Sequence, residues 1–320
     1  MALARLVEGS GTSELPLEAA GLRERLEREE FFWLDLHEPS EENLRELETA
    51  FGFHPLAIED SLHFGQRAKL EEYDDFVFLV VYGWAPDEDG LVEVHLYYSP
   101  QFLISIHRDE APALARICGR CEETLARDPE PILVLHQVVD SLVDSFTAPL
   151  ARVDERIEMI EEEMLASPRD GLLQDIMTMR RRITTLRRAI GPQRDLFGHF
   201  AAGVGALPGM TQEAERYFRD VYDHLFRLAE VIDAQRELMN GTIDVYLSAS
   251  SNRLGNVTKQ LTLIASVFLP LTFITGFFGQ NFGWMVDHVD TALAFFALGI
   301  GFQAAAVVLL LVYFKRQGWF

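Results

Sequence analysis

Two long apolar segments near the carboxyl-terminal end constrain the fold of this chain most strongly. Residues 261–286 and residues 291–314 contain no Asp, Glu, Lys or Arg. A helix of about 20 apolar residues crosses the hydrocarbon core of a bilayer, so each segment is long enough to span a membrane. The alternative is a helical hairpin buried in a large soluble core. Length and lack of charge favour a membrane hairpin, with transmembrane helices at residues 257–280 and 291–314.

Charged residues around the two segments predict the orientation of this hairpin. Arg253 and Lys259 precede the first segment, and Lys315 and Arg316 follow the second, whereas the loop 281–290 between them carries only acidic charges. Basic flanks tend to stay in the cytoplasm. The amino-terminal end has no apolar run suited to a signal peptide. We therefore expect a multi-pass protein of the cell (inner) membrane with both termini in the cytoplasm.

The charge balance of the chain narrows the classes of partner. Its 320 residues include 28 Lys and Arg against 50 Asp and Glu, a formal net charge of −22. This argues against a nucleic-acid binder, which needs a basic face, and favours cations as partners. Cys118 and Cys121 form a single Cys-x-x-Cys pair, too few ligands for a structural zinc site. No phosphate-binding glycine loop, serine nucleophile motif or paired-histidine motif is visible, so we do not expect an enzyme.

The first part of the chain has the pattern of a mixed α/β domain. Residues 76–84 are rich in β-branched and aromatic side chains, which is typical of a strand buried on both faces. Ser40 is suited to cap a helix whose first turn carries Glu41 and Glu42. Turn residues at 86–90 and 99–100 indicate hairpins. The strand candidates are residues 31–36, 76–84, 91–98 and 101–107.

From about residue 110 the pattern becomes helical. Residues 132–166 form one long amphipathic stretch with an acidic end, and residues 171–190 carry five arginines, which suggests an antiparallel helix pair matched by charge. Residues 211–278 contain no proline before Pro270 and predict a helix of about 100 Å if unbroken. The predicted domains are an α/β cytoplasmic domain (1–130), a helical region with a stalk helix (131–256), transmembrane helix 1 (257–280), an extracytoplasmic loop (281–290), transmembrane helix 2 (291–314) and a cytoplasmic tail (315–320).

One face of the first transmembrane segment gathers small and hydroxylated residues. At 100° per residue they fall in a narrow sector, with a leucine at its edge. Such a face suits close packing of helices in a membrane, and it also suits a narrow, weakly polar pore. Two helices cannot enclose a pore, so the second interpretation requires an oligomer. The residues of this face are Thr258, Leu261, Thr262, Ala265, Leu269, Thr272 and Gly276.

Several motifs in order along the chain resemble the CorA family of divalent-cation channels. The match extends from about Trp33 to Phe320, and the motifs are specific because they occur together at matching spacing. They are residues 54–60 (HPLAIED), 66–69 (QRAK), 218–224 (FRDVYDH), 251–254 (SNRL), 270–282 (PLTFITGFFGQNF) and 313–316 (YFKR).

The resemblance implies a funnel-shaped homopentamer in the bilayer. Each subunit would supply an α/β cytoplasmic domain, a long stalk helix that becomes the pore-lining first span, and an outer second span. The family's Gly-Met-Asn signature corresponds to Gly279, Gln280 and Asn281, the implied selectivity filter. Mg²⁺ keeps much of its water shell, which amide and carbonyl oxygens can hold by hydrogen bonds. Asp287 and Asp290 would form an outer ring that attracts cations.

The resemblance also implies regulation by cytoplasmic Mg²⁺ bound between subunits. Asp60 and Asp220 match the inter-subunit site, and Glu59 and Asp140 match the neighbourhood of a second ion. Carboxylates are the oxygen ligands that such an ion prefers. His224, in the same stalk segment, could ligate Co²⁺, Ni²⁺ or Zn²⁺. We expect a regulatory Mg²⁺, with Co²⁺ or Zn²⁺ as alternatives, and no permanently bound cofactor.

The residues of the implied filter bear on which ion is transported. We expect influx of Mg²⁺, and also of Co²⁺ and Ni²⁺. Gln280 replaces the usual methionine, Phe278 stands where tyrosine is usual, and the zinc-transporting ZntB branch also departs from the signature at the middle residue. Proton-coupled Zn²⁺ transport is therefore the first alternative. A membrane-tethered sensor or scaffold without transport is the second, from another functional class.

Overall fold

The computed structural model describes residues 3–28, 30–85, 90–127, 130–166, 171–204, 207–280 and 282–319. The chain divides into two compact units, residues 1–243 and residues 244–320. Helix α8, Gln212–Phe278, begins in the first unit and ends in the second. The expected combination of an α/β region, a long helix and two apolar carboxyl-terminal helices is confirmed.

The first unit is built around a seven-stranded sheet with the order β2-β1-β3-β7-β6-β5-β4. All neighbouring pairs are antiparallel except β3 and β7, which run parallel. The predicted strands agree with β3, β5, β6 and β7, whereas the β1–β2 hairpin and β4 were not predicted. The strands are β1 (Leu3–Glu8), β2 (Gly11–Pro16), β3 (Phe32–His37), β4 (Lys69–Glu72), β5 (Val77–Ala85), β6 (Gly90–Tyr98) and β7 (Phe102–His107). Residues 86–89 of the predicted 86–90 turn lie outside the described residues.

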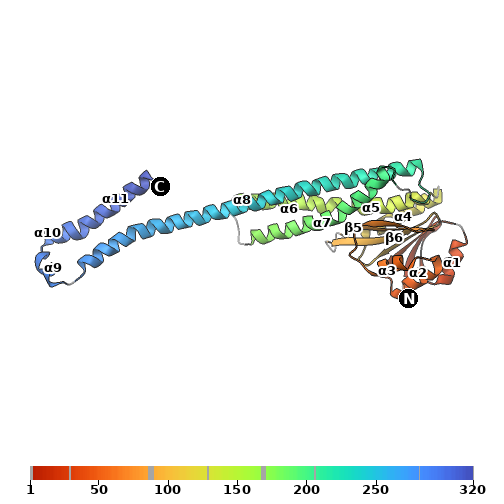
Figure 1. Ribbon diagram of the computed structural model, residues 1–320, viewed down its shortest axis with the longest axis horizontal. Coiled ribbons are helices and arrows are strands. Elements are labelled where there is room, and N and C mark those ends of the chain that lie inside the picture. The colour runs from red at the N-terminus through yellow and green to blue at the C-terminus, as the bar shows by residue number, and fades with distance from the viewer. Residues whose placement is uncertain are drawn as a thin grey trace. The chain divides into compact units, whose positions relative to one another are not determined.

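Helices cover both faces of this sheet. Figure 1 shows α1, α2 and α3 on one face, and α4 and α5 on the other. Every residue of β5 is buried, as its apolar sequence predicts. Ser40 and Asn43 form a capping box at the start of α2, which ends at Gly52 with φ = 69°. These helices are α1 (Ala19–Leu26), α2 (Glu41–Phe51), α3 (Pro55–Leu62), α4 (Pro112–Arg127) and α5 (Pro131–Asp144).

Side chains from the helices satisfy the backbone of β5 beyond the end of its short neighbour β4. The N–H of Tyr82 donates to Gln193 Oε1 at 2.9 Å, and the N–H of Trp84 donates to Ser145 Oγ at 2.7 Å. A Cβ at Gly83 would come within 2.7 Å of the Leu142 side chain, so this glycine lets α5 approach the strand closely. Such contacts fix α5 and α7 on the sheet.

The helical part of the first unit differs from the sequence prediction in two respects. The stretch 132–166 is two helices, α5 and α6 (Thr147–Ala166), separated at Ser145. Helix α7 (Leu172–Ala201) continues beyond residue 190 and contains Pro192. One ion pair between α6 and α7 has Arg156 on the acidic helix and Asp175 on the basic one, at 2.8 Å. In this pair the signs are the reverse of those that the composition suggested.

Two helices are long and apolar enough to cross a membrane, Gln212–Phe278 and Ala292–Arg316. The second unit contains the carboxyl-terminal part of the first helix and the whole of the second. Only 6% and 0% of their most apolar windows are buried, which is the opposite of a hairpin inside a soluble core. Gln303 donates to Thr275 Oγ1 at 3.1 Å and joins the two helices. The elements after α8 are α9 (Gly283–His288), α10 (Ala292–Ala294), the π-helix η1 (Phe295–Gly301) and α11 (Phe302–Arg316).

Candidate metal centre and ion path

A cluster of two carboxylates and one imidazole joins α5 to α8 in the first unit. The ligand atoms of Asp140, Asp144 and His224 all lie within 4.8 Å of one another, and His224 Nδ1 is 3.3 Å from Asp144 Oδ1. Asp140 and Asp144 are four residues apart and therefore share one face of α5. Among the described residues this is the group whose geometry could hold a metal ion. We call it the α5–α8 cluster.

The α5–α8 cluster carries more negative charge than its own side chains neutralise. Burial raises the pKa of Asp140, and the nearby carboxylates of Asp144 and Asp220 raise it further, while His224 and Arg120 oppose this rise. A cation bound here would stabilise the ionised form of Asp140, because its positive charge would offset both the cost of burial and the repulsion between the carboxylates. Aspartate oxygens with an imidazole nitrogen suit Co²⁺, Ni²⁺ or Zn²⁺, and the carboxylates alone also suit Mg²⁺.

His136 extends the same face of α5 by one turn. Its Nε2 is buried and has no hydrogen-bond partner in the described part of the chain, and burial lowers its pKa. Its ring lies 5.1 Å from the ring of Tyr217 on α8. The sequence analysis missed Asp144 and His136. The spacing His-x₃-Asp-x₃-Asp on one helix would have found both, since residues four apart lie on one face.

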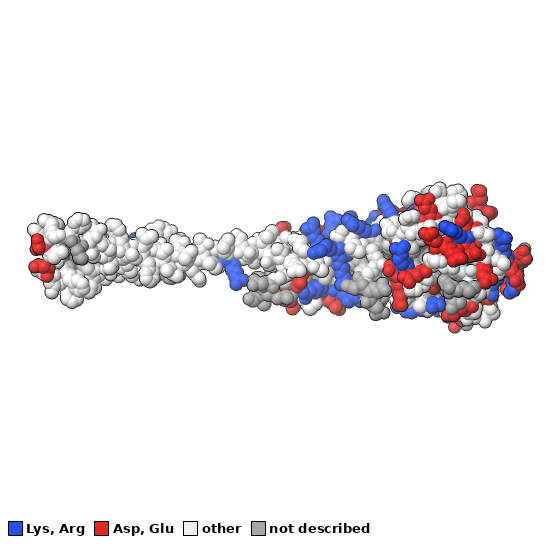
Figure 2. Space-filling view, turned by 90° about the horizontal axis from the view of Figure 1, so that it is seen from below, with Lys and Arg blue, Asp and Glu red and all other residues white. Residues whose placement is uncertain are grey.

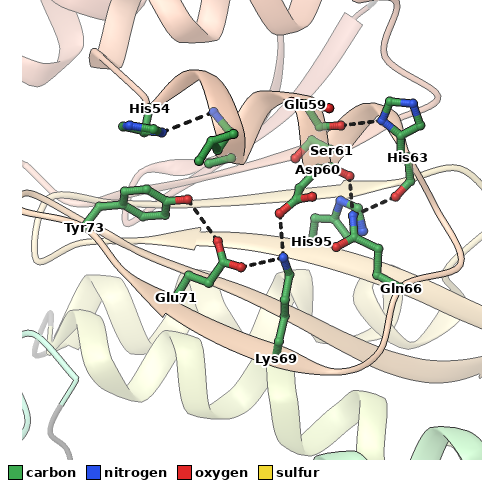
Figure 3. Close-up of polar contacts among 12 residues, drawn as sticks. His54, Glu59, Asp60, Ser61, His63, Gln66, Lys69, Glu71, Tyr73 and His95 are labelled. Carbon is green, nitrogen blue, oxygen red and sulfur yellow. Dashed lines mark hydrogen bonds and ion pairs between the residues drawn. The ribbon is translucent and has the colours of Figure 1, made fainter.

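Of the residues expected to bind regulatory ions, three lie on α5 and α8 and two lie elsewhere. Asp140, Asp220 and His224 belong to this region, and Asp220 acts electrostatically on both Asp140 and His136. Glu59 and Asp60 lie on α3. Figure 3 shows α3 on one side of the strands, and Figure 1 shows α4 and α5 on the other face of the sheet. One chain therefore does not bring Asp60 and Asp220 together.

Asp60 is already paired with a cation of its own chain. Lys69 Nζ lies 2.5 Å from Asp60 Oδ2 and 2.6 Å from Glu71 Oε1 (Figure 3). Burial opposes the charge on Lys69, but its hydrogen bonds to the two carboxylates raise its pKa above the usual value. Tyr73 donates to the other oxygen of Glu71 at 2.9 Å. We call Asp60, Lys69, Glu71 and Tyr73 the α3–β4 cluster.

A buried carboxylate holds the loop that connects the two parts of the α3–β4 cluster. Glu93 on β6 accepts hydrogen bonds from the N–H groups of Gly65 and Gln66, and contacts His95 Nε2 at 2.8 Å. Burial opposes ionisation of Glu93, but the hydrogen bonds from His95 and Gly65 keep its pKa below the usual value. The Gln66 amide donates to the Asp60 and His63 carbonyls at 2.7 Å (Figure 3). Asp60 is thus positioned by the sheet below it.

The candidate pore face is open to the surroundings in the second unit. All seven of its residues are exposed, and Leu269 keeps 71% of its surface. The helix α8 instead buries Ile274, on another face. Thr262 and Thr272 donate to carbonyls of their own helix at 2.8 Å, so their hydroxyl oxygens keep lone pairs directed outward. Within one chain this face is not used for helix packing.

The end of α8 shows why a glycine occurs at the expected mouth. A Cβ at Gly279 would lie 3.0 Å from the Thr275 carbonyl oxygen, which accepts the Gly279 N–H at 2.9 Å. Asn281 lies outside the residues that the structure describes, so its place is a sequence prediction. Gln280 and Asp290 line a pocket of about 280 Å³ at this end of the unit. Figure 2 shows a surface largely free of charge along this unit, with acidic side chains at one end.

Comparison with known proteins decides the family. The model of the "CorA-like Mg2+ transporter protein" family matches residues 28–316. This chain belongs to that family. The cobalt/magnesium transport protein CorA of Thermotoga maritima is 31% identical over 284 residues, 84% of this chain and 77% of that protein. The zinc transport protein ZntB of Klebsiella pneumoniae is 30% identical over 201 residues, 61% of this chain and 58% of that protein.

The fold agrees with this assignment. The complete structure of the CorA magnesium transporter from Methanocaldococcus jannaschii superimposes with a TM-score of 0.81 at 20% identity, over 100% of this chain and 99% of that one. The protein is accordingly a divalent-cation transporter of the CorA family, and its two apolar carboxyl-terminal helices are those of a membrane protein.

Proposed function

We propose that five copies of this chain form a channel for influx of divalent cations, with Mg²⁺ as the physiological ion and Co²⁺ and Ni²⁺ as further permeant ions. The observation that carries the proposal is the composition of α8, Gln212–Phe278. This one helix contains His224 of the α5–α8 cluster and the exposed face of small and hydroxylated residues. An ion that binds the cluster therefore acts directly on the helix that lines the pore.

The exposed face supplies the features that a hydrated cation requires. In a ring of α8 helices, the outward lone pairs of Thr272 would accept hydrogen bonds from the water shell of Mg²⁺. Leu261 and Leu269, which are 66% and 71% exposed in the single chain, would form apolar constrictions that close by dewetting. Gly279, Gln280 and Asn281 would form the filter, and the acidic residues Asp287 and Asp290 would concentrate cations outside it.

Closure by cytoplasmic Mg²⁺ follows from the same charges. A cation can bias the gate only if it binds the closed assembly more tightly than the open one. Asp60 lies on α3 and Asp220 on α8, so an ion that bridges them does so between subunits. The α5–α8 cluster offers a second site within each subunit. Loss of both ions would leave acidic subunits that repel one another, which favours the open state.

Transport of Zn²⁺ coupled to protons is the second candidate. It is favoured by Gln280 in the filter, by the imidazole of His224, and by the similarity to a zinc transport protein. An imidazole with carboxylates accepts Zn²⁺ readily. The two candidates differ in the ion that enters and in the need for a pH gradient.

Flux into liposomes that contain the purified protein separates these candidates. Mg²⁺, Co²⁺, Ni²⁺ and Zn²⁺ are offered one at a time to a dye inside the vesicles, with and without a pH gradient. We expect Mg²⁺ entry that ignores the gradient and is lost in Asn281→Ala and Gly279→Ala. Asp223→Asn, on an exposed part of α8, is the control. Gradient-dependent Zn²⁺ entry would establish the ZntB-like alternative, and absence of any flux would leave a tethered sensor.

A further inference from the structure

A basic groove lies in the first unit, and none of its lining residues belongs to either acidic cluster. Its volume is about 460 Å³, and it is lined by residues of α7, by residues of α8 and by Arg67. Four arginines line it, Arg67, Arg187, Arg188 and Arg194, against only two carboxylates, Asp195 and Asp233. The groove therefore carries a local charge of +2 in a chain whose net charge is −22. Figure 2 shows basic side chains gathered on the helical part of this unit.

The ion pairs within the groove leave its positive charge available. Arg187 Nε lies 2.9 Å from Asp233, and Arg194 holds Asp195 through two nitrogens at 2.7 and 3.2 Å. Arg67 reaches Asp195 only at 3.8 Å and is 74% exposed. Arg188 makes no hydrogen bond or ion pair with any residue that the structure describes. Exposed pairs of this kind contribute little to stability, so an incoming anion can exchange with the carboxylates.

The backbone of α7 is anchored at the turn that carries Arg188 and Arg194. Pro192 lies inside the helix and has no N–H, so the carbonyl of Arg188 lacks its usual helical donor. The next residue, Gln193, is fully buried and receives the N–H of Tyr82 from β5 at 2.9 Å. This turn of α7 is therefore anchored to the sheet. A site on an anchored helix keeps its geometry better than one on a loop.

The lining combines the charged side chains with one part-exposed apolar residue. Pro192 is part-exposed in the groove, whereas Ile190 and Ile232 are fully buried. Arginine binds phosphate oxygens through two parallel N–H bonds, and it also stacks on flat rings. The volume lies within the range of sites for small organic ligands. Charge alone would suit any small anion, whereas several guanidinium planes together with the part-exposed Pro192 suit a phosphorylated molecule with a ring.

We propose that this groove binds an anion of the nucleoside di- or triphosphate class. The phosphates contact Arg187, Arg188 and Arg194, and the base stacks on a guanidinium plane beside Pro192. The proposal concerns binding alone and does not depend on which ion the protein transports. It assigns a function to an arginine-rich segment that neither the ion path nor the acidic clusters use.

Isothermal titration tests this site on the full-length protein in nanodiscs of zwitterionic lipid. ATP, pyrophosphate and inorganic phosphate are titrated separately, with EDTA present so that no chelated Mg²⁺ reaches the acidic clusters. We expect saturable binding of ATP, weaker binding of pyrophosphate, and still weaker binding of inorganic phosphate. Loss of one charged phosphate contact raises a dissociation constant by about tenfold or more, and we expect this for ATP in Arg188→Glu.

Arg181→Glu is the matched control, because Arg181 is exposed on the same helix and does not line the groove. It should keep wild-type ATP affinity, and both variants should keep the wild-type melting temperature without ligand. A second variant, Arg194→Gln, should also weaken ATP binding. The proposal is wrong if ATP does not saturate the wild-type protein, if both glutamate variants lose affinity equally, or if inorganic phosphate binds as tightly as ATP.

Discussion

The two acidic clusters of the first unit differ in how their charge is neutralised. In the α3–β4 cluster, Lys69 places an ammonium between Asp60 and Glu71, at 2.5 and 2.6 Å. In the α5–α8 cluster, His224 lies beside Asp144 and Arg120 acts on Asp140 through its charge, yet burial and repulsion still raise the pKa of Asp140. The first cluster holds a Lys in direct contact with its carboxylates, whereas no Lys or Arg in the described part of the chain forms an ion pair with Asp140 or Asp144. A metal ion should therefore bind more readily at the second.

The largest effect should come from removing the buried support of the α3–β4 cluster. Glu93→Ala leaves His95 fully buried without its partner, and leaves the N–H groups of Gly65 and Gln66 without an acceptor. Removing one partner of such a buried pair costs about 3–5 kcal/mol. Urea denaturation of the purified protein should show this loss. Glu71→Gln, at a part-exposed carboxyl, should cost much less, and an equal loss in both variants would contradict this role of Glu93.

The next effect tests whether the α5–α8 cluster binds a metal ion through its own carboxylates. Asp144→Asn should weaken Co²⁺ binding by about tenfold or more, equal to about 1.4 kcal/mol, because it removes a charged ligand of the α5–α8 cluster. Titration calorimetry with Co²⁺ measures the affinity. Asp223→Asn makes the same change of charge one residue from His224, on an exposed position, and should leave the affinity unchanged. Equal weakening by both variants would mean that only overall charge matters.

How far the sequence predicted these features depends on the range of the interactions. The uninterrupted helix from residue 212 to 278 was predictable, because an apolar and amphipathic pattern without a proline before Pro270 is a local signal. The β1–β2 hairpin was missed because β2 is short and mostly exposed, and so lacks the alternation of a half-buried strand. Asp140 and His224 were found by resemblance, but not Asp144, although its spacing from Asp140 was visible.

Other contacts could not be read from local patterns. Lys69 pairs with Asp60 only because the loop after α3 folds back over β6, where Glu93 holds it. Gln193 and Ser145 reach the N–H groups of β5 across the interface between helices and sheet. These contacts join segments that are distant in the sequence, and no periodicity signals them. The same reasoning explains why the basic groove, which adds Arg67 to α7 and α8, appeared in the sequence only as an arginine run.

A smaller effect is expected when the α3–β4 cluster loses the Lys69 ammonium and so comes to resemble the α5–α8 cluster. Lys69→Gln removes the resident ammonium and leaves Asp60 and Glu71 for an external cation. We expect Mg²⁺ to raise the melting temperature of this variant roughly a few-fold more than that of the wild type, since part-exposed charge pairs are individually weak. Arg45→Gln also removes a cation that lies beside a carboxylate, at 3.6 Å from Glu41, and should not change the response. An unchanged response to Mg²⁺ in Lys69→Gln would argue against a metal site at Asp60.

The smallest effect concerns a third pair of titratable residues, Asp35 and His107, which is buried in the sheet. His107 on β7 lies 3.3 Å from Asp35 on β3, which also accepts the Ser105 hydroxyl at 2.5 Å. Burial opposes the charge on His107, but the nearby carboxylate of Asp35 raises its pKa above 6.5. The folded state therefore binds this proton more tightly than the unfolded state. The stabilisation is complete below about pH 6.5 and is lost as the pH rises through the higher pKa of the folded protein.

Denaturation at a series of pH values measures this dependence. The free energy of unfolding should fall as the pH rises above about 6.5, by less than the loss expected for Glu93→Ala. His107→Gln should lose this part of the slope, because it keeps a polar side chain near Asp35 but cannot titrate. His199, which is exposed on α7, provides the control His199→Gln, with an unchanged slope. If His107→Gln keeps the full dependence of the unfolding free energy on pH, the Asp35–His107 pair is not the source of that dependence.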